Sequence, residues 1–204
     1  MDATVKVGVL GGTFDPIHNG HLAIAEEVRG QLALSEVWFV PAGQPWLKTG
    51  RAVSPSEQRV AMIELAIAGK PYFKISRLEV SRPGPTYTID TMVEIRRLLK
   101  GASLFFIMGW DSLASLPLWK EAPRLIEICR LVAVPRPGSP PPDLTVLEKE
   151  IPGLSRKLDM LDKPRLDISA TAVRARVADG LSIDRLVPRP VAAYIRKNRL
   201  YLRG

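Results

Sequence analysis

Residues 5–22 read Val-Lys-Val-Gly-Val-Leu-Gly-Gly-Thr-Phe-Asp-Pro-Ile-His-Asn-Gly-His-Leu, and this stretch decides the fold of the chain. The valines at positions 5, 7 and 9 alternate, which predicts a short buried strand. Gly11 and Gly12 follow, and glycine lets the backbone bend and lets a ligand come close. An apolar segment from Leu22 then predicts a helix. A turn at the carboxyl end of a parallel strand is where α/β proteins bind ligands.

The same turn predicts an anion site. The first N–H groups of a helix have no partner within it, and the helix dipole adds positive charge there. His18 and His21, the two histidines of the chain, lie at this turn and can become cationic near neutral pH. Capping or packing is the alternative role for a histidine. Two of them beside one glycine-bounded turn favour anion binding.

Residues 168–176, Ile-Ser-Ala-Thr-Ala-Val-Arg-Ala-Arg, predict a second anion site. Ser169 is a natural N-cap, so Thr171 falls in the first turn of a helix and Arg174 one turn later. Hydroxyls, unpaired N–H groups and a guanidinium would then gather at one helix N-terminus. Alone, this pattern is common in ordinary capped helices. Together with the histidine turn, the pattern at 169–174 favours a phosphate site.

Working outward, apolar runs at 36–40, 73–80 and 104–108 predict further strands, and 157–161 predicts a last edge strand. The run 126–134 predicts the end of a helix and a further buried strand. Helices are expected at about 20–33, 54–68, 90–99, 169–178 and 191–197, with a short helical region at 113–119. Strands that alternate with helices predict an α/β, Rossmann-like fold with a mostly parallel sheet, flanking helices and a C-terminal helical part. We expect one domain over 1–204, with the proline-rich segment 135–142 as a surface loop.

Composition narrows the class of protein. The 204 residues are 46% hydrophobic, contain no apolar run long enough to span a membrane and begin almost directly with a strand, so we expect neither a membrane span nor a signal peptide. The single cysteine, Cys129, reads as a core residue. These features predict a cytoplasmic protein. The net charge of +8 is scattered and forms no nucleic-acid motif, so we expect no nucleic-acid partner. The sequence is compatible with a homo-oligomer without indicating one.

Gly11–His21 resembles the His-x-Gly-His signature of the nucleotidylyltransferase superfamily. The resemblance implies that the protein joins ATP or CTP to a phosphorylated acceptor and releases pyrophosphate. Residues 168–174 resemble the superfamily's Ile-Ser-Ser-Thr-x-x-Arg motif, with Ala170 in place of the second serine. Neither the dinucleotide fingerprint nor a P-loop occurs in the chain.

Three further stretches resemble the bacterial nicotinate-nucleotide adenylyltransferases: the segment Leu78–Thr91, with its Tyr-Thr-x-Asp-Thr ending, Gly109-Trp-Asp111 with the later Trp119, and the C-terminal pattern that ends at Leu200-Tyr201. This resemblance implies transfer of AMP from ATP to nicotinate mononucleotide, giving nicotinate adenine dinucleotide and pyrophosphate. One departure is Leu47, where the family usually has a histidine before a lysine.

The resemblance also implies roles for individual residues. His18, His21 and Arg174 would be catalytic. The ATP-binding residues would be Gly11, Gly12, Thr13, Phe14, His18, His21, Lys48, Ser169, Thr171 and Arg174. The acceptor-binding residues would be Tyr87, Thr88, Asp111 and Trp119. Mg²⁺ would be bound mainly through the ATP phosphates, without a dedicated protein site. Asp15 would be structural.

Three alternatives remain open at this point. Pantetheine-phosphate adenylyltransferases share the His-x-Gly-His opening but lack the Tyr-Thr-x-Asp-Thr segment. A glycerol-phosphate type of cytidylyltransferase shares the same chemistry with another acceptor. A nucleotide- or RNA-binding module without catalysis could use the same anion sites, and the intact histidines argue against it.

Overall fold

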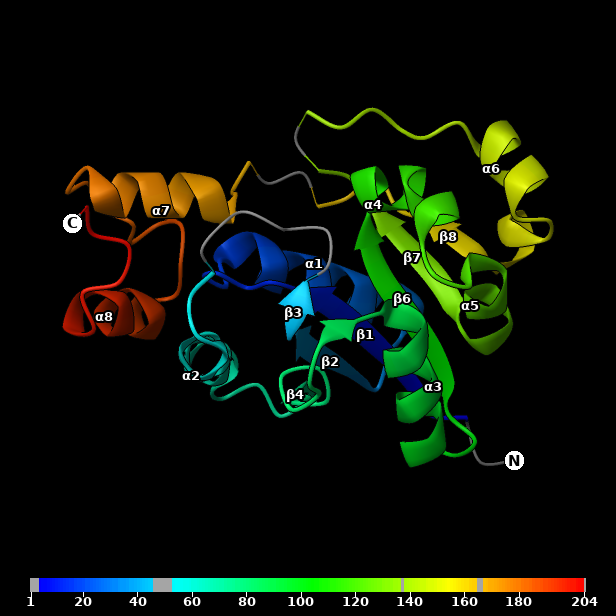
Figure 1. Ribbon diagram of the computed structural model, residues 1–204, viewed down its shortest axis with the longest axis horizontal. Helices are drawn as coiled ribbons and strands as arrows, with labels where there is room; N and C mark the ends of the chain where they lie inside the picture. Colours follow the sequence, from blue (N-terminus) through cyan, green and yellow to red (C-terminus); the bar gives the residue numbers. More distant parts are fainter. Residues whose placement is uncertain (1–3, 46–52, 137, 165–166, 204) are drawn as a thin grey trace.

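The computed structural model describes residues 4–45, 53–136, 138–164 and 167–203, with the side chains of residues 44 and 45 left out (Figure 1). Its centre is a parallel sheet of six strands in the order β4-β2-β1-β6-β7-β8. The strands are β4 (Phe73–Ile75), β2 (Glu36–Pro41), β1 (Lys6–Gly12), β6 (Ser103–Gly109), β7 (Arg130–Val134) and β8 (Leu158–Met160). This confirms the predicted α/β class and the edge position of the last strand.

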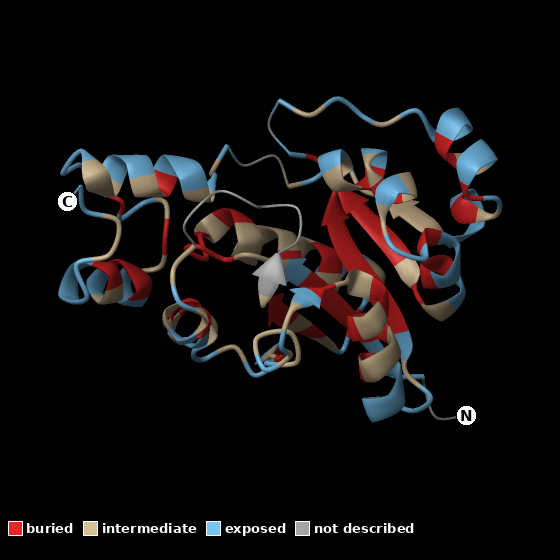
Figure 2. Ribbon diagram, viewed as in Figure 1, coloured by how far each residue is buried: buried red, intermediate tan, exposed pale blue. Residues whose placement is uncertain are grey.

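Helices cover both faces of the sheet. One face packs against α1 (Asn19–Leu32) and α2 (Ser56–Ile67); α8 (Arg189–Lys197) packs on α2, and α7 (Ala170–Ala178) joins the same core through Val173. The other face packs against α3 (Thr88–Leu98), α4 (Trp110–Ala114), α5 (Ala122–Ile128) and α6 (Leu144–Glu150). Two short 3-10 turns lie at Leu116–Leu118 and Leu154–Lys157. Figure 2 shows the buried strands between these two helical layers, whose outer sides are exposed.

The central strands are buried on both faces, which explains their unbroken apolar sequences. In β6, Phe105 and Ile107 belong to the core under α1, α2 and α8. Phe106 and Met108 belong to the core under α3 and α5. Successive side chains of a strand point to opposite faces, so one apolar run supplies both cores.

The ligand-binding edge follows from the strand order. From β1, the chain crosses through α1 to β2 on one side, while the neighbour on the other side is β6. The order therefore reverses between β1 and β6. In open α/β sheets, the crevice at the carboxyl ends of such strands is the usual binding site. Here those ends carry Gly12 and Gly109.

The local structure differs from the sequence-based expectations in three places. The run 73–80 is a strand only to Ile75, because the chain then turns, with Ser81 N–H bonded to the Arg77 carbonyl at 3.0 Å. The short strand β3 (Gln44–Pro45), which was not predicted, pairs in parallel with β5 (Pro85–Thr86). A two-stranded edge tolerates proline there. Helix α6 was not predicted, although the Asp143 carboxylate caps it.

The remaining elements agree with the sequence. The predicted helices appear within a few residues of their expected ends, and the described residues of 135–142 form neither helix nor strand. Cys129 is buried, and burial raises the pKa of its thiol to about 12, as suits a core residue. Within the described ranges, no helix combines the length and the apolar character that a membrane span needs.

Candidate active site

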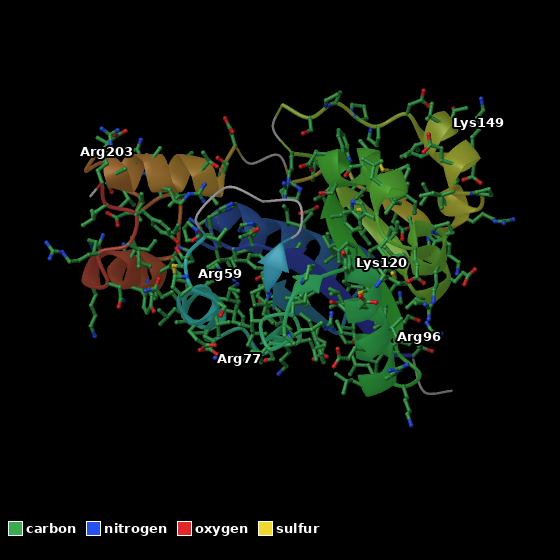
Figure 3. The ribbon with its side chains drawn as sticks, in the orientation of Figure 1. Arg59, Arg77, Arg96, Lys120, Lys149 and Arg203 are labelled. Carbon is green, nitrogen blue, oxygen red and sulfur yellow. The ribbon has the colours of Figure 1, made fainter. Side chains whose placement is uncertain are left out.

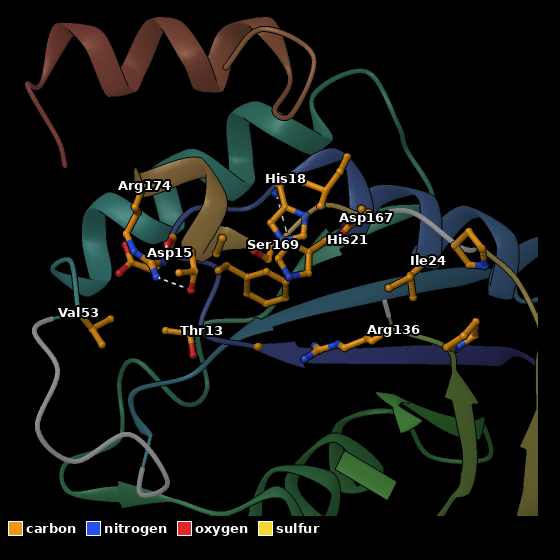
Figure 4. A pocket seen from close by; sticks show the side chains of 18 residues that line it. Thr13, Asp15, His18, His21, Ile24, Val53, Arg136, Asp167, Ser169 and Arg174 are labelled. Atoms are coloured by element: carbon orange, nitrogen blue, oxygen red, sulfur yellow. Dashed lines mark hydrogen bonds between the residues drawn. The ribbon is translucent and has the colours of Figure 1, made fainter. Parts of the chain in front are cut away.

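A cavity of about 430 Å³ lies where β1 ends, between the N-termini of α1 and α7 (Figure 4). Cavities of this size hold small-molecule ligands. The residues that line it include most of those expected at the ATP site: Gly12, Thr13, Phe14, His18, His21, Ser169, Thr171 and Arg174. Two stretches separated by about 150 positions in the sequence therefore form one site. Both predicted anion sites turn out to be halves of a single cavity.

The glycine turn is shaped by an aromatic ring. A Cβ atom on Gly12 would lie 3.0 Å from the Phe14 ring, so a side chain there would force the ring to move. Phe14 is buried, has a φ of 49° and meets the His21 ring edge-on at 4.9 Å between centroids. Gly11 is different, since a Cβ there would meet only ordinary contacts and the residue does not line the cavity. Gly12 is therefore the glycine that the turn requires.

His18 is the N-cap residue of α1 and is only 6% exposed. Its Nδ1 atom is buried and has no hydrogen-bond partner within the described part of the chain. Burial, and secondarily the positive charge of Arg136, lower the pKa of His18 to about 4. His18 is therefore neutral at pH 7. A buried polar atom without a partner at a cavity wall is suited to a ligand atom.

Gly20 makes room for His18, because a Cβ atom there would lie 3.0 Å from the His18 Nδ1. This accounts for the glycine between the two histidines. The His18 and His21 rings stack with their centroids 3.7 Å apart. The backbone N–H of His18 donates to His21 Nδ1 at 3.2 Å. That bond places the proton of a neutral His21 on Nε2, where it can be donated to a ligand.

The N-terminus of α7 brings hydroxyls and a guanidinium to the cavity. Ser169 caps the helix, as predicted, and its Oγ accepts the Ala172 N–H at 3.1 Å. The Arg174 Nη2 donates to Thr171 Oγ1 at 3.0 Å, and its Nη1 donates to the Asp15 carbonyl. Arg174 thus joins α7 to the turn that follows β1. The hydrogen bonds fix the guanidinium beside the cavity rather than leaving it on the surface.

A second cation of the cavity, Arg136, was not predicted from the sequence. It follows the end of β7, and its Nη1 donates to Asp111 Oδ2 at 3.1 Å. Gly109 leaves space for this pair, since a Cβ atom there would lie 2.3 Å from Asp111 Oδ1. The sequence signal that could have identified Arg136 is its position just after the buried strand β7, which ends at the same edge of the sheet as β1. Asp111 itself does not line the cavity, and it reaches the site through Arg136.

Asp15 lines the cavity, but its carboxylate faces other protein groups. Oδ1 accepts from the Tyr201 hydroxyl at 2.7 Å, and Oδ2 accepts from the Ser54 N–H at 3.3 Å. The carboxylate is 5% exposed. Its oxygens are therefore occupied in holding the turn, in agreement with the structural role expected for it.

The residues expected to bind the acceptor lie outside this cavity. Tyr87 is the N-cap of α3, and the Lys120 Nζ lies 4.7 Å from the centre of its ring. The Trp119 Nε1 donates to Ser115 Oγ at 3.4 Å, and its ring meets Phe106 edge-on. Thr88 begins α3. Their acceptor role stays a prediction, and the prediction for Lys48 and Leu47 falls outside the described residues.

The segment that carries Tyr87 is braced by its own side chains. Glu79 accepts from the Thr91 hydroxyl at 2.8 Å, and Arg82 pairs with Glu94 at 2.6 Å. Burial raises the pKa of Glu79, and the Thr91 hydroxyl is the first of the hydrogen bonds that oppose this rise. The Glu79 backbone also packs closely against the neighbouring segment. A Cβ atom on Gly43 would lie only 2.2 Å from the Glu79 carbonyl oxygen. Much of the motif at 78–91 therefore builds a scaffold.

Comparison with known proteins agrees with this geometry. Residues 9–176 match a family described as cytidylyltransferase-like. A protein of Dehalococcoides mccartyi named "Probable nicotinate-nucleotide adenylyltransferase" is 48% identical over 98% of both chains. One of the same name from Roseiflexus sp. is 46% identical over 98% of this chain and 99% of its own.

Among solved structures, the Plasmodium falciparum nicotinic acid mononucleotide adenylyltransferase complexed with NaAD superposes with a TM-score of 0.79, at 20% identity over 97% of each chain. At that identity, the likeness supports the fold. The two relatives, which match over nearly the full length of both chains, show the family. This chain belongs to the nicotinate-nucleotide adenylyltransferases, within the cytidylyltransferase-like proteins.

Proposed function

We propose that the chain transfers AMP from ATP to nicotinate mononucleotide, forming nicotinate adenine dinucleotide and releasing pyrophosphate. The observation that carries this proposal is the meeting of two helix N-termini at one cavity, α1 with its histidine pair and α7 with Arg174. Both helix ends supply N–H donors and partial positive charge. Such an arrangement fits a triphosphate better than it fits an uncharged ligand.

The reaction needs positioning more than acid–base catalysis. The 5′-phosphate of the acceptor attacks the α-phosphorus in line, and a phosphate monoester is already a competent nucleophile. The protein therefore contributes by holding both phosphates and by stabilising charge that develops on the phosphate oxygens. His18 contacts the reacting α-phosphate. His21, Ser169, Thr171 and Arg174 neutralise the β- and γ-phosphates, and Lys48 joins them.

His18 changes its charge when the triphosphate binds. In the free protein its pKa lies at about 4 because it is buried and near Arg136. A phosphate oxygen beside the ring favours the imidazolium, since an opposite charge stabilises the charged form. ATP binding therefore raises the pKa of His18. The buried Nδ1 atom, which lacks a partner among the described residues, gains one when the phosphate arrives.

The acceptor lies beside the carboxyl ends of β6 and β5, over the segment that begins α3. Trp119 offers an aromatic face to the pyridine ring, and backbone N–H groups near Tyr87 and Thr88 receive its carboxylate. Asp111 meets the ribose of ATP or the acceptor. Arg136, paired with Asp111 at the cavity edge, lies between the two substrates.

Mg²⁺ accompanies the triphosphate, and it supplies charge neutralisation for the departing pyrophosphate. The residues that line the cavity fit an ion carried mainly by the ATP phosphates. Both Asp15 oxygens are engaged within the protein. Asp167 is the other carboxylate that lines the cavity, and it is exposed. An ion carried by the phosphates matches the preference of Mg²⁺ for phosphate and water ligands.

The test offers Mg-ATP with one of three acceptors, namely nicotinate mononucleotide, nicotinamide mononucleotide or phosphopantetheine, and follows pyrophosphate release. We expect turnover with nicotinate mononucleotide. Turnover with phosphopantetheine alone would favour the pantetheine-phosphate adenylyltransferase alternative. No pyrophosphate with any acceptor, together with RNA binding that weakens with salt, would favour the non-catalytic alternative. A cytoplasmic location suits this function, since both substrates are phosphorylated metabolites.

A further inference from the structure

The last turn of the chain returns to the active site. After α8, Arg199 and Tyr201 have φ values of 52° and 63°, which reverse the backbone. Leu200 and Tyr201 then pack against the core that lies under α1 and α2. Non-glycine residues rarely adopt such φ values, so their presence marks a specific path of the chain. This path carries the Tyr201 side chain to the turn after β1.

Tyr201 ends on a buried carboxylate of the cavity wall. Its hydroxyl donates to Asp15 Oδ1 at 2.7 Å, across 186 residues of sequence. Burial, followed by the bond to Asp15, raises the pKa of Tyr201. The phenol therefore stays protonated and acts as a donor throughout the working pH range. A hydrogen bond to a charged acceptor is stronger than one between neutral groups.

Arg59 completes this group of side chains. It is 2% exposed, and Figure 3 shows it at α2, whereas the labelled Arg96, Lys149 and Arg203 lie on the outer parts of the molecule. Its guanidinium donates to the Thr13 carbonyl at 2.8 Å and to the Ser54 carbonyl at 3.0 Å. The negative charge of Asp15 lies near enough to oppose the fall that burial causes in the pKa of Arg59. A buried cation needs both hydrogen-bond acceptors and a nearby opposite charge, and here the two carbonyls and Asp15 supply them.

Asp15 connects these groups to the cavity. Its carboxylate faces Tyr201 and Ser54, while its backbone carbonyl accepts from Arg174. Figure 4 shows Arg174 and Asp15 joined in this way, with Thr13 and Val53 nearby on the cavity wall. A change at Tyr201 therefore reaches Arg174 through one residue.

We propose that Tyr201 is a positioning residue for the ATP site. Through Asp15 it fixes the turn at 13–15 and the Arg174 guanidinium, so that both meet the triphosphate in the correct geometry. The tail touches no substrate. This inference rests on the proposed function of the cavity, and it adds the C-terminal segment to the ATP site.

The test compares Tyr201→Phe with a matched control, Tyr194→Phe. Tyr194 is a half-buried tyrosine of α8 that packs against the same core but does not line the cavity. We expect Tyr201→Phe to raise KM for ATP about tenfold, the value of one hydrogen bond to a charged group. KM for nicotinate mononucleotide should stay within twofold, and Tm should change no more than in the control.

A double-mutant cycle with Asp15→Asn separates positioning from simple loss of structure. If Tyr201 acts through Asp15, the double variant raises KM for ATP by clearly less than the product of the two single effects. The proposal is overturned if Tyr201→Phe leaves KM for ATP within twofold of the wild type. Equal increases in KM for both substrates, or fully multiplicative effects in the cycle, would also overturn it.

Titration with ATP in the absence of acceptor keeps the two proposals distinguishable. If the wild-type protein releases no pyrophosphate with any acceptor, the proposed reaction fails. The dissociation constant for ATP then still reports on Tyr201. A dissociation constant for ATP that is tenfold larger in Tyr201→Phe than in Tyr194→Phe supports the positioning role, and equal constants contradict it.

Discussion

The cavity between α1 and α7 and the segment at 79–91 use their side chains in different ways. At the cavity, the His18 Nδ1 atom is buried with no partner among the residues described, and burial together with the charge of Arg136 lowers the pKa of His18 to about 4. At 79–91, charged and hydroxyl groups bind one another, as in the pairs of Glu79 with Thr91 and of Arg82 with Glu94.

This difference shows two ways to recognise a phosphorylated ligand. In the cavity, side chains and helix ends act on the ligand themselves. In the other segment, side chains hold the backbone that is proposed to bind the acceptor. Substitutions in the first region should therefore change kcat and KM for ATP. Substitutions in the second region should change KM for the acceptor. Each of the following experiments would sharpen or break that division.

The largest effect is expected for His18→Ala. Removing one preorganised donor at the reacting phosphate should lower kcat about 10²–10³-fold. The control is Asn19→Ala, in the first turn of the same helix, whose amide donates to the Arg185 carbonyl at 3.0 Å instead of lining the cavity. Pyrophosphate release at saturating substrates measures both. A loss of less than tenfold in His18→Ala would place the reacting phosphate elsewhere.

The same histidine should make folding stability depend on pH. Its pKa is about 4 in the folded protein and 6.5 when unfolded, so the unfolded chain binds the proton more readily at acid pH. The stabilisation is present above pH 6.5 and is lost as pH falls through 4. At pH 4 this costs about 3 kcal/mol of unfolding free energy. Urea unfolding at pH 7 and pH 4 should therefore show a smaller loss for His18→Asn than for the wild type.

Arg174→Lys should weaken ATP binding without removing the charge. Arginine bonds Thr171 and the Asp15 carbonyl at once, and lysine lacks the planar fork that allows this. We expect KM for ATP to rise roughly tenfold. Arg176→Lys is the control, since Arg176 lies on the same helix and donates to the Ser182 carbonyl away from the cavity. Similar kinetics in the two variants would argue against a role for the guanidinium fork.

Thr91→Val should affect the other substrate. It removes the hydroxyl that Glu79 accepts while keeping the shape of a buried side chain. The Glu79 carboxylate then loses one of its donors, and the segment that holds Tyr87 loosens. KM for nicotinate mononucleotide should rise about fivefold, with KM for ATP unchanged. Thr145→Val, in exposed α6, serves as the control.

The smallest effect is expected for Arg77→Ala. Arg77 pairs with Glu57 and Glu64 at the surface, where its side chain is 48% exposed. Exposed ion pairs contribute about 0–1 kcal/mol. Kinetics with both substrates should match the wild type, and the midpoint of urea unfolding should be unchanged. A clear change in either KM would mean that the sheet edge communicates with the site.

Most of the fold could be predicted because its central strands are apolar on both faces and its helices have clear ends. Short elements escaped prediction. The two-residue strands β3 and β5 depend on a tertiary pairing, and α6 has a single fully buried position, Leu147. Local pattern carries no signal for the two strands, and for α6 it offers only the Asp143 cap.

The site was predictable where local sequence sets the chemistry and unpredictable where distant segments meet. The histidine turn and the Ser169 cap are local, so their placement at helix N-termini followed from the sequence. Arg136 and Arg59 are single arginines in a basic chain, and only the folded structure shows that both approach the turn after β1. Tyr201 matched a family pattern without a stated role, and its contact with Asp15 supplies one.

The most direct test of the division between the two regions measures KM for both substrates in His18→Ala and Thr91→Val side by side, with kcat from the same pyrophosphate assay. The predicted result is a fall in kcat for His18→Ala with KM for nicotinate mononucleotide within twofold of the wild type, and a rise in that KM for Thr91→Val with ATP unaffected. A rise in KM for ATP in Thr91→Val would contradict it. A His18→Ala variant whose main change is a rise in KM for nicotinate mononucleotide would also contradict it.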